Sequence, residues 1–74
     1  MYEAIPKLIK ISGLSAGNKF VKVRLKDGRT IECQADCFGE TEIEDEAFVD
    51  DLRVLLKDGG SEILIEDDIE EVIG

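Results

Sequence analysis

The sequence predicts a mostly-β domain, a five-stranded small barrel preceded by a short N-terminal helix. Two early segments, 19–26 and 29–37, alternate apolar and polar residues with a period of two, which is typical of strands with one buried face. Two later segments, 52–57 and 62–66, are rich in Leu, Ile and Val and flank a glycine-containing turn. The 74 residues fit one domain spanning 1–74.

The first element we expect is a helix over residues 4–12. Pro6 suits the first turn of a helix, and Gly13 suits the left-handed position that follows the last turn. Apolar residues recur between them at helical spacing: Ile5, Leu8 and Ile9. A strand at 8–12 is the alternative.

The parity of the first hairpin selects its turn. A two-residue turn at Asp27 and Gly28 would set apolar residues beside polar ones on one face, which the pleat forbids. A three-residue loop, with Gly28 left-handed in a bulge, avoids this conflict. It predicts four opposed pairs: Val21 with Cys33, Lys22 with Glu32, Val23 with Ile31 and Arg24 with Thr30.

For the second hairpin we expect a two-residue turn at Gly59 and Gly60. This turn predicts four opposed pairs: Val54 with Ile65, Leu55 with Leu64, Leu56 with Ile63 and Lys57 with Glu62. Leu55 and Leu64 would then form a second apolar face that needs a cover. The pattern V-x-L-K-D-G occurs at 23–28 and again at 54–59, which indicates two similar hairpins.

The segment between the hairpins allows two interpretations. In the first, part of 38–51 extends the second strand, part is a loop, and a third strand covers 52–57. In the second, the fold is α+β with a helix at 44–57, because apolar residues fall on one helical arc and Thr41 with Glu44 could form a capping box. A last strand follows, anchored by three apolar residues: Ile69, Val72 and Ile73.

Charge is distributed unevenly along the chain. Residues 1–31 carry seven Lys or Arg and two acids, a net charge of +5. Residues 32–74 carry two Lys or Arg and sixteen acids, a net charge of −14, and the total is −9. Either the two halves pair across the fold, or the surface is bipolar and steers a charged partner.

The cysteines and the apolar runs indicate a cytoplasmic protein. Cys33 and Cys37 are four residues apart in one expected strand, a separation of about 13 Å that excludes a disulfide. We therefore expect both to be reduced, small, buried apolar residues. No apolar run reaches the length of a membrane span, and the first residues lack the apolar region of a signal peptide.

The composition argues against catalysis, cofactors and metal binding. Histidine is absent, so no Ser–His or Cys–His pair exists. The acids between residues 40 and 51 could supply oxygen ligands for Ca²⁺ or Mg²⁺, but they lack the spacing of an EF-hand loop. We expect no enzyme activity, no cofactor and no metal.

Binding is the function class that remains, and its leading form is an acidic surface that engages a basic protein. The residues we expect to carry it are Glu42, Glu44, Asp45, Glu46, Asp50 and Asp51. The alternative is weak nucleic-acid binding by the basic hairpin 19–29, through Lys19, Lys22, Arg24, Lys26 and Arg29. A third candidate is a structural homo-oligomer that pairs edge strands 62–66 and 69–73.

Two stretches carry a family resemblance over residues 19–74. They are V-R-L-K-D-G at 23–28 and I-L-I-E-D-D-I at 63–69. The chain resembles the SH3-like and Sm-like small β-barrels, and is closest to the bacterial Rho-binding antiterminator type. That resemblance implies a bacterial binding module without activity of its own. The chain lacks the Asn-containing loop with which Sm proteins bind RNA, so RNA binding is not carried over.

Overall fold

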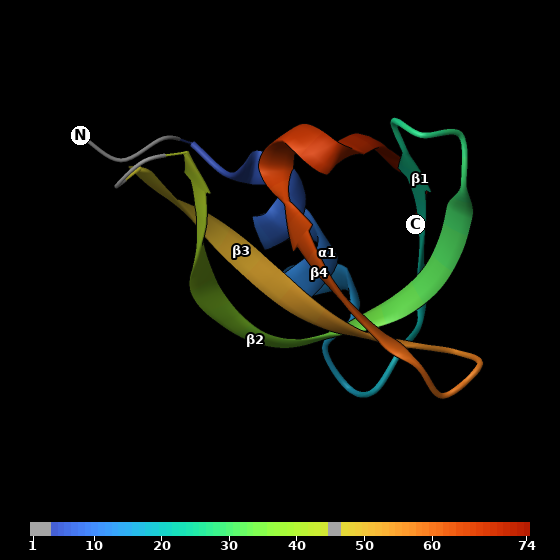
Figure 1. The fold of residues 1–74 in the computed structure, drawn as a ribbon. Helices are drawn as coiled ribbons and strands as arrows, with labels where there is room; N and C mark the ends of the chain where they lie inside the picture. Colours follow the sequence, from blue (N-terminus) through green and yellow to red (C-terminus); the bar gives the residue numbers. More distant parts are fainter. Residues whose placement is uncertain (1–3, 45–46) are drawn as a thin grey trace.

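The computed structural model describes residues 4–44 and 47–74. One helix and five strands follow one another in the order α1 (Pro6–Leu14), β1 (Val21–Leu25), β2 (Thr30–Glu44), β3 (Ala47–Leu56), β4 (Ser61–Ile65), a 3-10 turn η1 (Glu66–Asp68) and β5 (Ile69–Val72). The strands form one antiparallel sheet in the order β4-β3-β2-β1-β5. Figure 1 shows the long strands β2 and β3 curving around α1. The prediction of a mostly-β chain with a short N-terminal helix is confirmed.

The core lies between α1 and the concave face of the sheet. Helix α1 contributes Leu8 and Ile11, and the alternating pattern of β1 buries every second residue. The buried apolar residues are almost all aliphatic: Leu8, Ile11, Val21, Val23, Leu25, Cys33, Leu52, Val54, Leu64, Ile69 and Val72. Among the described residues, no helix is long and apolar enough to cross a membrane.

Helix α1 is capped by a residue from the other end of the chain. Ile5, the residue before the helix, supplies no side-chain cap. The Glu66 carboxylate of η1 instead accepts hydrogen bonds from the backbone N–H groups of Lys7 and Leu8 at 3.0–3.1 Å. This contact satisfies two of the free donors at the helix start and places a negative charge at its positive end.

The bounds of α1 differ from the expected 4–12, and the alternative of a strand at 8–12 is wrong. The helix begins at Pro6, passes through Gly13 and ends at Leu14. The left-handed residues after it are Gly17, with φ of 79°, and Asn18, with φ of 62°. Glycine and asparagine are the residues that adopt this conformation at least cost.

The first hairpin has the predicted turn and register. Val21 lies opposite Cys33 and Val23 opposite Ile31. Gly28 has a φ of 97°, and Leu25 closes the loop by donating to the Arg29 carbonyl oxygen at 2.8 Å. The bulged three-residue loop is confirmed.

The second hairpin uses the same turn, and the prediction of a two-residue Gly-Gly turn is wrong. Leu56 donates to the Gly60 carbonyl oxygen at 2.7 Å, and Gly59 is left-handed with φ of 100°. In both turns the aspartate side chain accepts from the backbone N–H two residues later, at 2.9 Å, in Asp27 to Arg29 and in Asp58 to Gly60. The Lys-Asp-Gly sequence therefore determines the turn, since it supplies both this acceptor and the left-handed glycine.

This turn changes every pair in the second hairpin. Leu52 lies opposite Leu64, and both are buried. Leu55 lies opposite Ser61 and is exposed, so the expected apolar seam of Leu55 with Leu64 does not exist. The ammonium of Lys57 pairs with Glu32 at 2.9 Å instead of Glu62.

The strand expected over 52–57 is confirmed as part of β3. The alternative of a helix at 44–57 is wrong, because β3 pairs with β2 over most of its length. A bulge between Ala35 and Cys37 interrupts this pairing and reverses the face on which later residues of β2 lie. Cys33 is therefore buried, whereas Cys37 is exposed, contrary to its expected burial. Both cysteines are free, as expected.

Candidate protein-binding hairpin

The outer half of the β2–β3 pair is a two-stranded ribbon. Strand β1 pairs only with residues 30–33 of β2, and β4 pairs only with residues 51–55 of β3. Beyond these limits the two strands pair with each other, up to Glu44 opposite Ala47. Figure 1 shows this part extending away from the body at the upper left. We call the described residues 38–44 and 47–51 the acidic hairpin.

The acidic hairpin carries four of the expected binding residues in its described part. Glu42, Glu44 and Asp50 lie on the ribbon, and the first two are exposed. Asp51 is only 6% exposed and accepts a hydrogen bond from the Thr41 hydroxyl group, so it does not contribute to the exposed surface. The two other expected residues, Asp45 and Glu46, lie outside the described residues.

Asp51 is held against the sheet by its cross-strand neighbour Gly39. A Cβ atom built on Gly39 would lie 3.0 Å from the Asp51 Oδ1 atom, a tighter contact than most Cβ atoms make, so the carboxylate would have to shift. Glycine therefore leaves room for the carboxylate to lie flat over β2. This buried carboxylate with its hydroxyl partner is a structural feature that the sequence pattern did not indicate.

The exposed acids of the hairpin have no ion-pair partner among the described residues. The four ion pairs in that part of the chain lie elsewhere: Arg24–Glu71 at 3.2 Å, Arg29–Asp27 at 2.8 Å, Arg29–Glu62 at 2.9 Å and Lys57–Glu32 at 2.9 Å. Glu40 lies directly opposite Asp50 in the register. Like charges in this position destabilise a strand pair, so the fold itself gains nothing from them.

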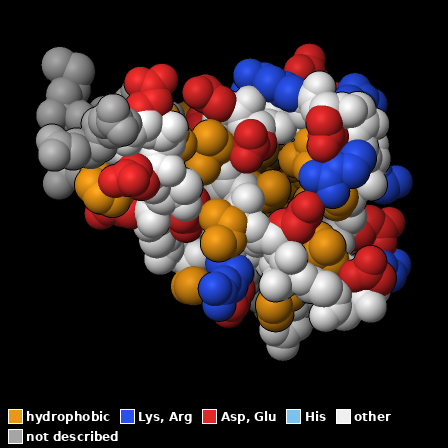
Figure 2. All heavy atoms as spheres, in the orientation of Figure 1, with side chains coloured by type: hydrophobic (Ala, Val, Ile, Leu, Met, Phe, Trp, Pro, Cys, Tyr) orange, Lys and Arg blue, Asp and Glu red, His pale blue; other side chains and the backbone are white. Residues whose placement is uncertain are grey.

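Exposed apolar side chains accompany these acids. Phe38 is 48% exposed, Phe48 is 61% exposed, and Ile43 is exposed as well. Directly opposed residues share a face, so the register places Phe38, Glu40, Glu42, Phe48 and Asp50 on the face where Leu52 enters the core. In Figure 2 hydrophobic and acidic side chains lie side by side over the hairpin, at the left. Neither phenylalanine was predicted as a binding residue, although acids lie two positions away from each in the sequence.

In the basic hairpin, the fold pairs the two arginines with acids and leaves the three expected lysines outside these pairs. The guanidinium of Arg24 pairs with Glu71, and that of Arg29 with Asp27 and Glu62. The remaining expected nucleic-acid contacts are exposed lysines outside these pairs: Lys19, Lys22 and Lys26. The Lys57 ammonium, helped by Lys22, lowers the pKa of Glu32 below its ordinary value.

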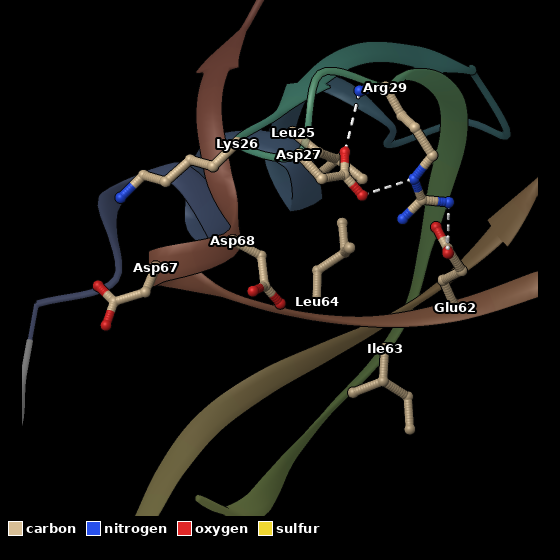
Figure 3. Close-up of a pocket in the computed structure, with 9 residues that line it drawn as sticks. All are labelled: Leu25, Lys26, Asp27, Arg29, Glu62, Ile63, Leu64, Asp67 and Asp68. Atoms are coloured by element: carbon tan, nitrogen blue, oxygen red, sulfur yellow. Dashed lines mark hydrogen bonds and ion pairs between the residues drawn. The ribbon is translucent and has the colours of Figure 1, made fainter.

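A hollow of about 200 Å³ lies where the first turn faces β4 and η1 (Figure 3). The Arg29 guanidinium lies across it between Asp27 and Glu62, and these two carboxylates raise the pKa of Arg29. In return, the Arg29 backbone N–H and guanidinium lower the pKa of Asp27. The lining mixes both signs of charge, and its arginine is already paired with two carboxylates. Arg29 therefore joins the first turn to β4.

No residue group in the described ranges is arranged as a metal site of three or more His, Cys, Asp or Glu. Comparisons of the chain with protein-family models, curated proteins and solved structures gave no match.

Proposed function

We propose that this chain is a non-catalytic binding module whose acidic hairpin engages a basic protein in the cytoplasm. The observation that carries the proposal is that Glu40, Glu42, Glu44 and Asp50 gather on one two-stranded ribbon and that none of them has an ion-pair partner within the described part of the chain. Exposed acids of one sign attract a basic partner, raise its association rate and select against acidic ones. The exposed Phe38 and Phe48 add apolar area to the same surface.

A protein partner is favoured over nucleic acid by the state of the two hairpins. The arginines of the basic hairpin already pair with acids of the fold, and the chain carries a net charge of −9. Phosphates would have to compete with those acids for each arginine and would meet net repulsion elsewhere. Capture from a lysate with and without nuclease distinguishes nucleic-acid binding from protein binding.

We further propose that the sheet belongs to a small barrel of SH3-like or Sm-like kind, similar to the bacterial Rho-binding antiterminator type. Strands β4 and β5 follow each other through η1, yet they form the two edges of the sheet. This is the arrangement expected of two strands on either side of a barrel seam. Two contacts lie beside it: the Lys26 N–H donates to the Asp68 carbonyl oxygen at 2.9 Å, and Arg29 pairs with Glu62.

The test is affinity capture from a bacterial lysate at low salt after nuclease treatment. We expect a basic protein to be retained by the chain and released as salt is raised, because exposed charges are screened. The variant Glu40→Lys/Glu42→Lys should lose this protein. The control Asp67→Lys/Glu70→Lys makes the same change in net charge outside the hairpin and should retain it. Equal capture by both variants, or loss of all captured material with nuclease, would contradict the proposal.

A structural homo-oligomer is the second candidate, and the position of the edges favours it. The strands expected to pair between copies, 62–66 and 69–73, correspond to the edge strands β4 and β5. Unpaired edges are templates for pairing with another chain. Sedimentation at two concentrations tests this candidate, and one species at the chain mass of 8.2 kDa throughout would contradict it.

A further inference from the structure

Strand β2 has a long free edge. Strand β1 covers it only at residues 30–33, and the Ala35 N–H donates to the Ser15 hydroxyl oxygen at 3.1 Å. From 36 to 44 this edge pairs with no strand among the described residues. These residues are exposed, apart from the half-buried Thr41.

A free edge of this length offers a row of backbone donors and acceptors to another strand. The ribbon also needs support, since an isolated two-stranded hairpin is marginally stable in water. A third strand would supply it. The edge has no proline, lysine or arginine between 36 and 44, and its two bulges lie at the ends of this segment, so the stretch between them is regular.

The charges of the edge decide which strand fits. Glu40, Glu42 and Glu44 lie along it. The same edge of a second copy would bring these acids opposite one another, and like charges in opposed positions are destabilising. A strand with lysine or arginine at alternate positions would instead form opposite-charge pairs on the face of Glu40 and Glu42. On the other face, the Asp51 carboxylate covers Gly39, and the exposed Cys37 and half-buried Thr41 form a surface against which β-branched side chains can pack.

We propose that an extended basic segment of the partner adds to this edge of β2, pairing through its backbone with residues 36–44. The added strand alternates basic and β-branched residues, with the basic ones over Glu40 and Glu42. This inference rests on the proposed function, since it specifies how the acidic hairpin holds its basic protein. It places the partner beside β2 and away from the sheet edges at β4 and β5.

The probe is a capped eight-residue peptide of alternating lysine and valine. In a strand, alternate backbone N–H groups point to opposite sides. Two further peptides therefore carry N-methyl groups on all lysines or on all valines. We expect one of the two to bind at least about tenfold more weakly than the parent, since several hydrogen bonds are lost, and the other to bind within about twofold. Fluorescence anisotropy measures all three affinities.

Amide hydrogen exchange locates the added strand on the protein. We expect slower exchange within 36–44 when the parent peptide is bound, with β4 and β5 unchanged. The variant Glu40→Lys/Glu42→Lys should lose the peptide, and Asp67→Lys/Glu70→Lys should keep it. Equal effects of the two methylated peptides, or protection in β4 or β5 only, would overturn strand addition to β2.

The peptide experiment and the lysate experiment test different proposals, so each can contradict its own. Salt-sensitive capture of a basic protein, together with no peptide binding, would overturn strand addition and leave the binding-module proposal in place. Capture that is indifferent to Glu40 and Glu42 would remove the proposal on which strand addition rests.

Discussion

The two halves of the β2–β3 pair differ in how many strand neighbours, buried side chains and ion pairs the fold gives them. In the body half, β1 and β4 flank the pair, Leu52 and Val54 are buried, and Glu32 is ion-paired with Lys57. In the outer half, the free strand edges and the acids Glu40, Glu42 and Glu44 lack such partners among the described residues, and several apolar side chains are exposed. Folding therefore explains the residues of the first half, whereas the second half carries the surface that we propose for the partner.

The largest expected difference between the halves is in the cost of removing a side chain. Leu52→Ala, in the body half, should lower the free energy of unfolding by about 2–5 kcal/mol, because it leaves a cavity in the core. Phe48→Ala, in the outer half, should change it by no more than about 0.5 kcal/mol. Urea unfolding measures both. A large loss from Phe48→Ala would mean that the outer half packs against the body.

The two cysteines lie on either side of the bulge that separates the halves, so their reactivity reports the burial of each side. Exposed Cys37 should react with iodoacetamide in the native state, and buried Cys33 only after unfolding. Burial, with a smaller effect of the Glu62 carboxylate, raises the pKa of the Cys33 thiol from 9.0 to about 11. The folded state thus favours the neutral thiol.

The stability that Cys33 contributes should consequently be complete below its ordinary pKa of 9.0 and lost as the pH rises toward about 11. Urea midpoints of the wild type and of Cys33→Val across this pH range provide the measurement. An identical alkaline decline in both proteins would contradict the assignment to Cys33.

The smallest expected effects on stability come from changes of surface charge, and these effects have opposite signs in the two halves. Glu32→Lys should destabilise the fold, since it sets two lysines side by side. Glu40→Lys should stabilise it by up to about 1 kcal/mol, because it replaces a like-charge pair with an opposite one. Thermal unfolding at low salt measures both.

The stability that the Glu32–Lys57 pair contributes to the body half should depend on pH. The Lys57 ammonium lowers the pKa of Glu32, so this pair stabilises the fold above the ordinary carboxyl pKa of 4.5 and is lost as the pH falls through the lower, folded-state value. The stability difference between wild type and Glu32→Gln should therefore disappear in acid. A difference that persists there would assign the effect to packing.

The parity of apolar residues predicted the first hairpin completely, since only one register kept Val21 and Val23 on a face with their partners. The prediction for the second hairpin is wrong because a cross-strand pair such as Lys57 with Glu62 does not determine the turn. The repeated Lys-Asp-Gly pattern already contained the correct answer: the aspartate acceptor and the left-handed glycine act locally and do not depend on side-chain pairs across the strands.

The charge of the candidate site could be predicted from the sequence, but the face on which each of its residues lies could not. The run of acids after residue 39 located the surface, but the bulge after Ala35 sets which face each residue takes. No local sequence signal marks that bulge, so the exposure of Cys37 was missed. The burial of Asp51 was missed as well, because it depends on Gly39 and Thr41 across the ribbon.

The cap that Glu66 places on α1 has a consequence for synthesis of the chain. The carboxylate and the N–H groups that it accepts from are separated by 58 and 59 residues in sequence. A helix of nine residues is too short to be stable alone in water. On the ribosome, its first turn therefore lacks this cap until residue 66 has emerged, and α1 is expected to become ordered only after β4 has been synthesised.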